Sequence, residues 1–207
     1  MTAVSHGETL GSMQDLARAA IGLMPPDCRF QPADAEAIRR HQGLLLACEP
    51  GLVRGFYDLV YGHAATAAVF VEGERPAREA TLVNWWRRTA EGPLDDDYFA
   101  WMAMVGLVHV VRDVGNPMML AMAGFVADFV AGEVASAGLD PAEAEALTGA
   151  LRRLTSTVGA IITFGYDRAV VSALFSVAGM PAPLLRRLRD QEVAAVLASA
   201  REQLPSR

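Results

Sequence analysis

Apolar residues recur at helical spacing along most of the chain, and proline- and glycine-rich turns separate the apolar stretches. Tyrosine and isoleucine are scarce, while alanine, leucine, valine and arginine dominate, which favours helices over strands. We therefore predict an all-α chain, with residues 1–11 disordered because they show no periodicity. The predicted helices cover residues 13–24, 32–47, 52–63, 77–90, 95–114, 118–137, 140–175 and 184–204.

The most informative stretch covers residues 94–119, which are largely apolar and contain one histidine, His109. Three aspartates at 95–97 suit the positive end of a helix, and Gly-Asn-Pro at 115–117 is a stop signal. At 3.6 residues per turn, His109 shares one stripe with Tyr98, Met102 and Val105. The imidazole is therefore predicted to point into apolar surroundings.

A histidine in apolar surroundings has two interpretations. It is either a neutral structural imidazole whose ring N–H bonds a backbone carbonyl, or a ligand to a metal or cofactor. The periodicity alone does not distinguish them.

Two motifs resemble the globin-coupled sensor and protoglobin family. Residues 94–109 combine an acid cluster, an aromatic and the string VGLVHVV before a Gly/Pro break, and resemble the segment that carries the proximal histidine. Residues 55–59 (GFYDL) resemble the B helix, whose tyrosine lies over the distal face of the haem. The separation of Tyr57 from His109 is similar to that in the family, and the resemblance extends over roughly residues 34–180.

The resemblance implies a globin-like fold with an extra N-terminal helix and a C-terminal helical extension. Residues 1–180 would form the haem domain, and residues 181–207 a C-terminal helix of the same domain. His109 would bind the iron of non-covalent haem b, since the chain has no Cys-x-x-Cys-His motif. The residues expected to line the haem pocket are Tyr57, Val71, Thr81, Trp85, Met102, Val105 and Phe125.

Two features of this expected site remained open. The second ring nitrogen of His109 needs an acceptor, either the carbonyl of Val105 or the carboxylate of Asp113, and an acid there would favour peroxide chemistry. Tyr57 is the expected donor to bound O2, against the alternative of a core-boundary tyrosine with its hydroxyl in water or on a carbonyl. The chain also has Trp101 and Met102 where the family often has a basic residue to pair with the haem propionates.

Composition restricts the partners. The 207 residues (22.1 kDa) suffice for one sizeable core, and a net charge of −6 argues against nucleic acid. Two cysteines and no secretory signal predict a cytoplasmic location. The apolar stretches at 98–111 and 155–180 are interpreted as core helices rather than membrane spans, because the first is short and the second contains charges.

The expected function is reversible binding of a diatomic gas (O2, CO or NO) by a sensor or carrier. The family resemblance also implies a homodimer formed through the last two long helices. The alternatives are a haem-free globin-fold signalling module, or a haem enzyme such as a peroxidase or a nitric oxide dioxygenase. His41 and His63 are the other histidines considered as ligands.

Overall fold

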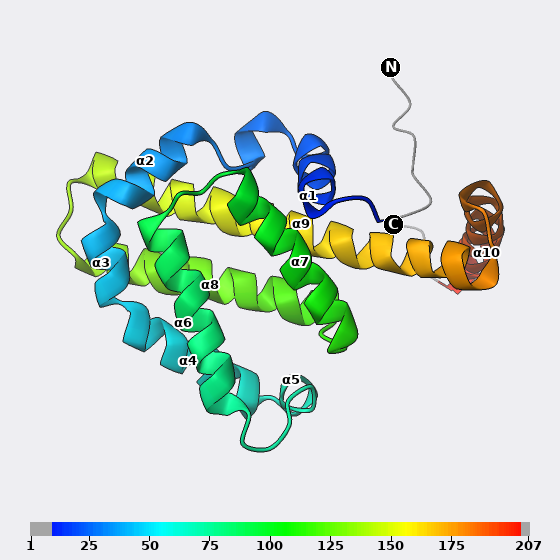
Figure 1. The fold of residues 1–207 in the computed structure, drawn as a ribbon, viewed down its shortest axis with the longest axis horizontal. Helices are drawn as coiled ribbons and strands as arrows, with labels where there is room; N and C mark the ends of the chain where they lie inside the picture. The colour runs from blue at the N-terminus through cyan, green and yellow to red at the C-terminus, as the bar shows by residue number, and fades with distance from the viewer. Residues whose placement is uncertain (1–9, 204–207) are drawn as a thin grey trace. The chain divides into compact units, whose positions relative to one another are not determined.

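The computed structural model describes residues 10–203, and every regular element in that range is helical. This confirms the predicted all-α, globin-like fold, while most of the disorder predicted for residues 1–11 falls outside the described range. The elements are α1 (Met13–Gly22), the 3-10 turn η1 (Pro26–Cys28), α2 (Pro32–Arg40), α3 (Gln42–Ala47), α4 (Glu49–Gly62), α5 (Ala64–Ala67), α6 (Arg75–Glu91), α7 (Asp96–Val111), α8 (Asn116–Ser136), α9 (Pro141–Ala178) and α10 (Ala182–Gln203) (Figure 1).

The helix predicted over residues 32–47 is in fact two helices, α2 and α3, separated at His41. The backbone of His41 leaves the helical conformation (φ −106°, ψ 20°). The last carbonyls of a helix have no partner within it, and here the carbonyl of Leu45 accepts the indole N–H of Trp86 at 2.7 Å. This bond joins the C-terminal end of α3 to α6.

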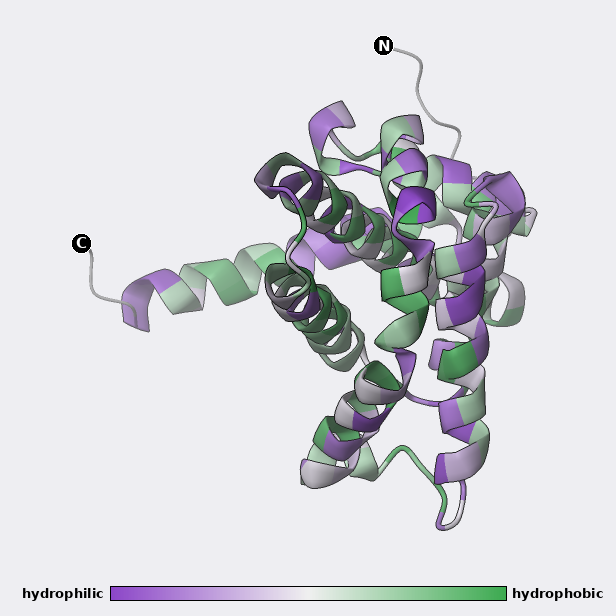
Figure 2. Ribbon diagram, turned by 90° about the vertical axis from the view of Figure 1, so that its left-hand side faces the viewer, coloured by the Kyte–Doolittle hydropathy of each residue, from purple (hydrophilic) through white to green (hydrophobic). Residues whose placement is uncertain are grey.

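Contacts within the chain define two compact units. The first is Ser12–Tyr166, and the second contains the end of α9 from Asp167 together with α10. This division falls inside α9. Near the C-terminus in Figure 2, α10 carries both hydrophobic and hydrophilic residues, as its amphipathic pattern predicts.

Helix α7 is apolar on nearly every face and is packed closely in the first unit. Figure 1 shows α7 lying across α8 and α9. A Cβ added to Gly106 would lie 3.0 Å from the backbone oxygen of Ile162 in α9, so the two helix backbones touch at this point. Phe99 packs edge-on against Phe30, with ring centroids 5.5 Å apart. These contacts fix the rotation of α7.

The ends of α7 are set by local hydrogen bonds. The Asp95 carboxylate accepts the N–H of Tyr98 at 3.0 Å, which confirms the predicted acidic start. The helix ends at Val111, before the predicted stop at residues 115–117, because Asp113 adopts a left-handed conformation (φ 57°). The N–H of Val114 then bonds the carbonyl of His109 at 2.9 Å, which forms a Schellman-type cap. His109 therefore lies in the last turn of the helix.

Two helices, α8 and α9, are long and apolar enough to cross a membrane on length and composition alone. In each helix, 28% of the most apolar stretch of 18 residues is buried within the structure. The same two helices also contribute side chains to the cavity described next.

Candidate functional site

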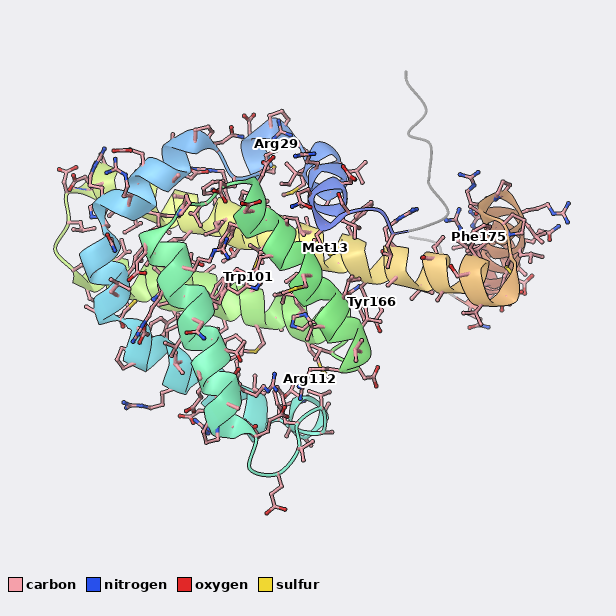
Figure 3. All side chains as sticks on the ribbon, viewed as in Figure 1. Met13, Arg29, Trp101, Arg112, Tyr166 and Phe175 are labelled. Carbon is pink, nitrogen blue, oxygen red and sulfur yellow. The ribbon has the colours of Figure 1, made fainter. Side chains whose placement is uncertain are left out.

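An apolar cavity of about 380 Å³ lies within the first unit. Its walls come mainly from α4, α6, α7, α8 and α9, and it is partly open to solvent, since the lining residue Thr81 is exposed. Figure 3 labels two of the lining residues, Trp101 on α7 and Arg112 just beyond its end. The side chains of α7 that line it are Trp101, Met102, Met104, Val105, Val108 and His109.

His109 is the one histidine among the described residues that lines this cavity. Its Nδ1 atom is buried and has no hydrogen-bond partner. Burial lowers the pKa of the imidazole below its usual value of 6.5, which favours the neutral ring. Buried polar atoms without a partner are rare in folded proteins and call for an explanation.

Neither acceptor expected for His109 is bonded to it. Nδ1 makes no hydrogen bond to the carbonyl of Val105 or to the carboxylate of Asp113. Asp113 is exposed and lies beyond the end of α7, in the left-handed conformation. The prediction had placed it on a continuous helix, one turn after His109. The structure thus leaves one ring nitrogen of His109 free.

Tyr57 is buried in α4 and lines the cavity. Its hydroxyl donates to the carbonyl of Arg78 in α6 at 2.8 Å, which is the alternative arrangement considered for this residue. Burial raises the pKa of the phenol to about 12, so the group stays protonated. Because a phenol has one O–H, Tyr57 could donate to a ligand only by releasing the Arg78 carbonyl.

The other residues expected at the pocket divide into two groups. Thr81, Trp85, Met102 and Val105 line the cavity, although the Thr81 hydroxyl donates to the carbonyl of Ala77 in its own helix. Val71 and Phe125 do not line it. Val71 is 71% exposed in the turn before α6.

Phe125 lies outside the cavity because α8 presents a different face to it. The Phe125 ring packs edge-on against Phe56 and lies 3.0 Å from where a Cβ of Gly55 would be.

Several residues that line the cavity were not predicted from the sequence, although their helical spacing on α8 and α9 was a usable signal. The residues of α8 and α9 in the cavity wall are Met118, Met119, Met122, Ala123, Val126, Thr155, Val158 and Ile162.

A charged cluster that was also missed stands at the cavity wall. The Glu74 carboxylate pairs with Arg78 Nη2 at 2.7 Å and with Arg112, and it accepts the N–H of Val71 at 3.2 Å. Both arginines line the cavity. The bond from the Val71 N–H and the two arginines hold the pKa of Glu74 below its usual value. The Glu74–Arg78 pair has helical i, i+4 spacing and could have been found from the sequence, whereas Arg112 could not.

The protoglobin family model matches residues 28–169, more than half of the chain. The chain belongs to the protoglobin family. The matched range includes every residue that lines the cavity. A comparison with curated proteins finds no match.

Membership of this family implies a bound haem, and the residues present fit one. The cavity offers apolar walls for the macrocycle, the imidazole of His109 for the iron, and two guanidinium groups for the carboxylates. The two arginines, Arg78 and Arg112, lie outside the first part of α7, where the sequence lacks a basic residue. Among the described residues, no cluster of three or more His, Cys, Asp or Glu side chains offers a separate metal site.

The lowered pKa of His109 predicts a specific pH dependence of stability in the haem-free protein. Between the unfolded pKa near 6.5 and the lower folded value, the unfolded chain binds more protons, so the free energy of unfolding falls as pH falls. His109→Gln removes this contribution. Urea denaturation at about pH 7.5 and about pH 5.5 should show a smaller loss of stability in the variant than in the unaltered protein. An equal loss in both would mean that burial does not disfavour the charged imidazole.

Proposed function

We propose that this protoglobin binds haem b non-covalently through His109 and binds a diatomic gas (O2, CO or NO) reversibly. The observation that carries the proposal is the imidazole of His109 in the wall of a largely apolar cavity, where neither Val105 nor Asp113 bonds to its Nδ1 atom. Haem iron supplies an open coordination position for the gas. The neutral imidazole that burial favours is the form that ligates a metal.

The remaining residues of the cavity bind and orient the cofactor. Apolar side chains of α7, α8 and α9 exclude water from most of the wall, which favours reversible ligand binding. Tyr57 contributes a hydroxyl group that could donate a hydrogen bond to a polar ligand in the cavity. A haem enzyme has less support, because the exposed Asp113 does not bond to His109.

Hemin titration of the haem-free protein tests the proposal. We expect an intense Soret band at one hemin per chain, and a loss of at least about tenfold in affinity for His109→Ala, because the iron loses its protein ligand. His63→Ala is the matched control, since His63 is exposed and does not line the cavity. Failure of the unaltered protein to take up hemin would support the haem-free signalling module instead.

Release of O2 tests the role of Tyr57. A hydrogen bond to a charged or strongly polar partner contributes about 1.5 kcal/mol or more, but Tyr57 must first leave the Arg78 carbonyl. We therefore expect Tyr57→Phe to speed O2 release by about tenfold in stopped-flow measurements. Tyr61→Phe is the control, because Tyr61 stands one turn further along α4 and does not line the cavity. An unchanged release rate would remove Tyr57 from the ligand site.

We also propose a cytoplasmic homodimer, without membrane insertion, formed through the last two long helices, α9 and α10. Helices α8 and α9 both contribute residues to the cavity, which supports their role as core helices. On α9, Val170 and Val177 are 47% and 88% exposed and share one face. Sedimentation velocity should show a dimer, and the double variant Val170→Glu, Val177→Glu should be monomeric. Leu23→Glu, at a residue 72% exposed after α1, should remain dimeric, and a monomeric unaltered protein would contradict the proposal.

A further inference from the structure

We propose that Arg78 and Arg112 form the subsite that receives the two carboxylates of the haem, and that Glu74 occupies this subsite until the haem enters. The inference rests on the proposed function, because it assumes that haem is the ligand of the cavity. It assigns the basic partners that the first part of α7 lacks.

The cluster has a surplus of positive charge. Two guanidinium groups share one carboxylate, and the pairing is through the same Glu74 oxygen, Oε1. The side chains of Arg78, Glu74 and Arg112 are only 28%, 15% and 27% exposed. A net positive charge with limited access to water attracts an anionic group of a ligand.

Arg78 has a hydrogen-bond donor that the protein does not satisfy. Its Nε atom is buried and has no partner, although Nη2 of the same side chain bonds to Glu74. A buried donor without an acceptor is costly, and a guanidinium can bind a carboxylate through two parallel N–H groups. A carboxylate entering from the cavity could therefore gain a bond that Glu74 leaves unmade.

The position of the cluster matches a ligand with an apolar body and an anionic edge. Arg112 follows α7 in the turn after His109, and Arg78 is on α6, yet both line the same apolar cavity. Such a cavity suits a flat apolar ring whose metal reaches His109 and whose carboxylates reach the arginines. Gas molecules alone have no group that needs these charges.

Glu74 is suited to be displaced. Its lowered pKa means that it is ionised at neutral pH, so it presents to the arginines the same chemical group as the incoming ligand. Glu74 is the N-cap residue of α6 and closes the turn that precedes this helix. The N–H of Val71 donates a hydrogen bond to its second carboxylate oxygen, Oε2. Entry of haem would then exchange one carboxylate for another, and neither of the partly buried arginines would be left unpaired.

The experiment compares hemin with hemin dimethyl ester, in which both carboxylates are neutral. Each is loaded into the full chain, and its rate of loss to excess apomyoglobin is followed by absorbance. We expect Arg78→Gln and Arg112→Gln each to lose hemin about tenfold faster than the unaltered protein, and all three to lose the ester at the same rate. Arg112→Lys should restore most of the retention, because it keeps the charge.

Two further variants sharpen the comparison. Arg75→Gln is the matched control on α6, because Arg75 pairs with Asp58 and Glu79 and does not line the cavity. Glu74→Gln should hold hemin at least as long as the unaltered protein, since a neutral amide competes less well for the arginines. Faster loss of hemin from Glu74→Gln would overturn the displacement of Glu74.

The outcomes separate this inference from the proposed function. If the unaltered protein takes up neither hemin nor the ester, the proposed function fails. If it binds both but the arginine variants lose hemin at the normal rate, only the subsite fails. Equal acceleration for hemin and the ester, or an effect on O2 release without an effect on hemin retention, would also overturn the subsite, because neither depends on the carboxylates.

Discussion

The structure depends on the need to cover α7, a helix that is apolar on almost every face. A helix of this kind cannot present a long face to water and is stable only when neighbours cover it. Helix α9 approaches so closely that its backbone touches α7 at Gly106, where any side chain would collide with Ile162. Other helices cover most of the remainder, and the side of α7 that they do not fill borders the cavity. The burial of His109 follows from this arrangement.

The end of α7 contributes as much to the site as its apolar face. Asp113 takes the left-handed conformation that glycine usually supplies, at a cost of about 1 kcal/mol, and the helix stops at Val111, within one turn of His109. The cap engages the carbonyl of His109 with the N–H of Val114. Arg112 is thereby placed at the cavity wall, where it pairs with Glu74. One local turn thus positions both the imidazole of His109 and a positive charge.

Arg78 connects the two polar parts of the cavity. Its carbonyl accepts the hydroxyl of Tyr57, and its side chain pairs with Glu74, which in turn pairs with Arg112. A hydrogen-bonded chain therefore runs from α4 through α6 to the end of α7. Under the two proposals, gas binding at Tyr57 would act on the backbone carbonyl of Arg78, and carboxylate binding at the arginines would act on its side chain.

The family match and the cavity cover the same part of the chain. The matched range, residues 28–169, contains the cavity and ends within α9, close to the division between the two compact units. Helix α10 and the end of α9 form the second unit and contribute nothing to the cavity wall. The cavity is therefore formed by residues of the first unit.

Local sequence by itself determined the helices, the acidic start of α7 and the apolar surroundings of His109, because capping and 3.6-residue periodicity act over short distances. Motif resemblance added the family and the separation of Tyr57 from His109. The break at His41, the early end of α7 at Asp113, and the exclusion of Val71 and Phe125 from the cavity required the tertiary structure.

Tertiary structure also decided which polar groups are satisfied. The Tyr57 hydroxyl finds the Arg78 carbonyl, and Arg112 joins Glu74, across helices that are distant in sequence. The free nitrogen of His109 is likewise a property of packing, since the same residue on a solvated helix would bond to water. Periodicity specifies which face of a helix is buried. The hydrogen-bond partners on that face depend on how the neighbouring helices pack against it.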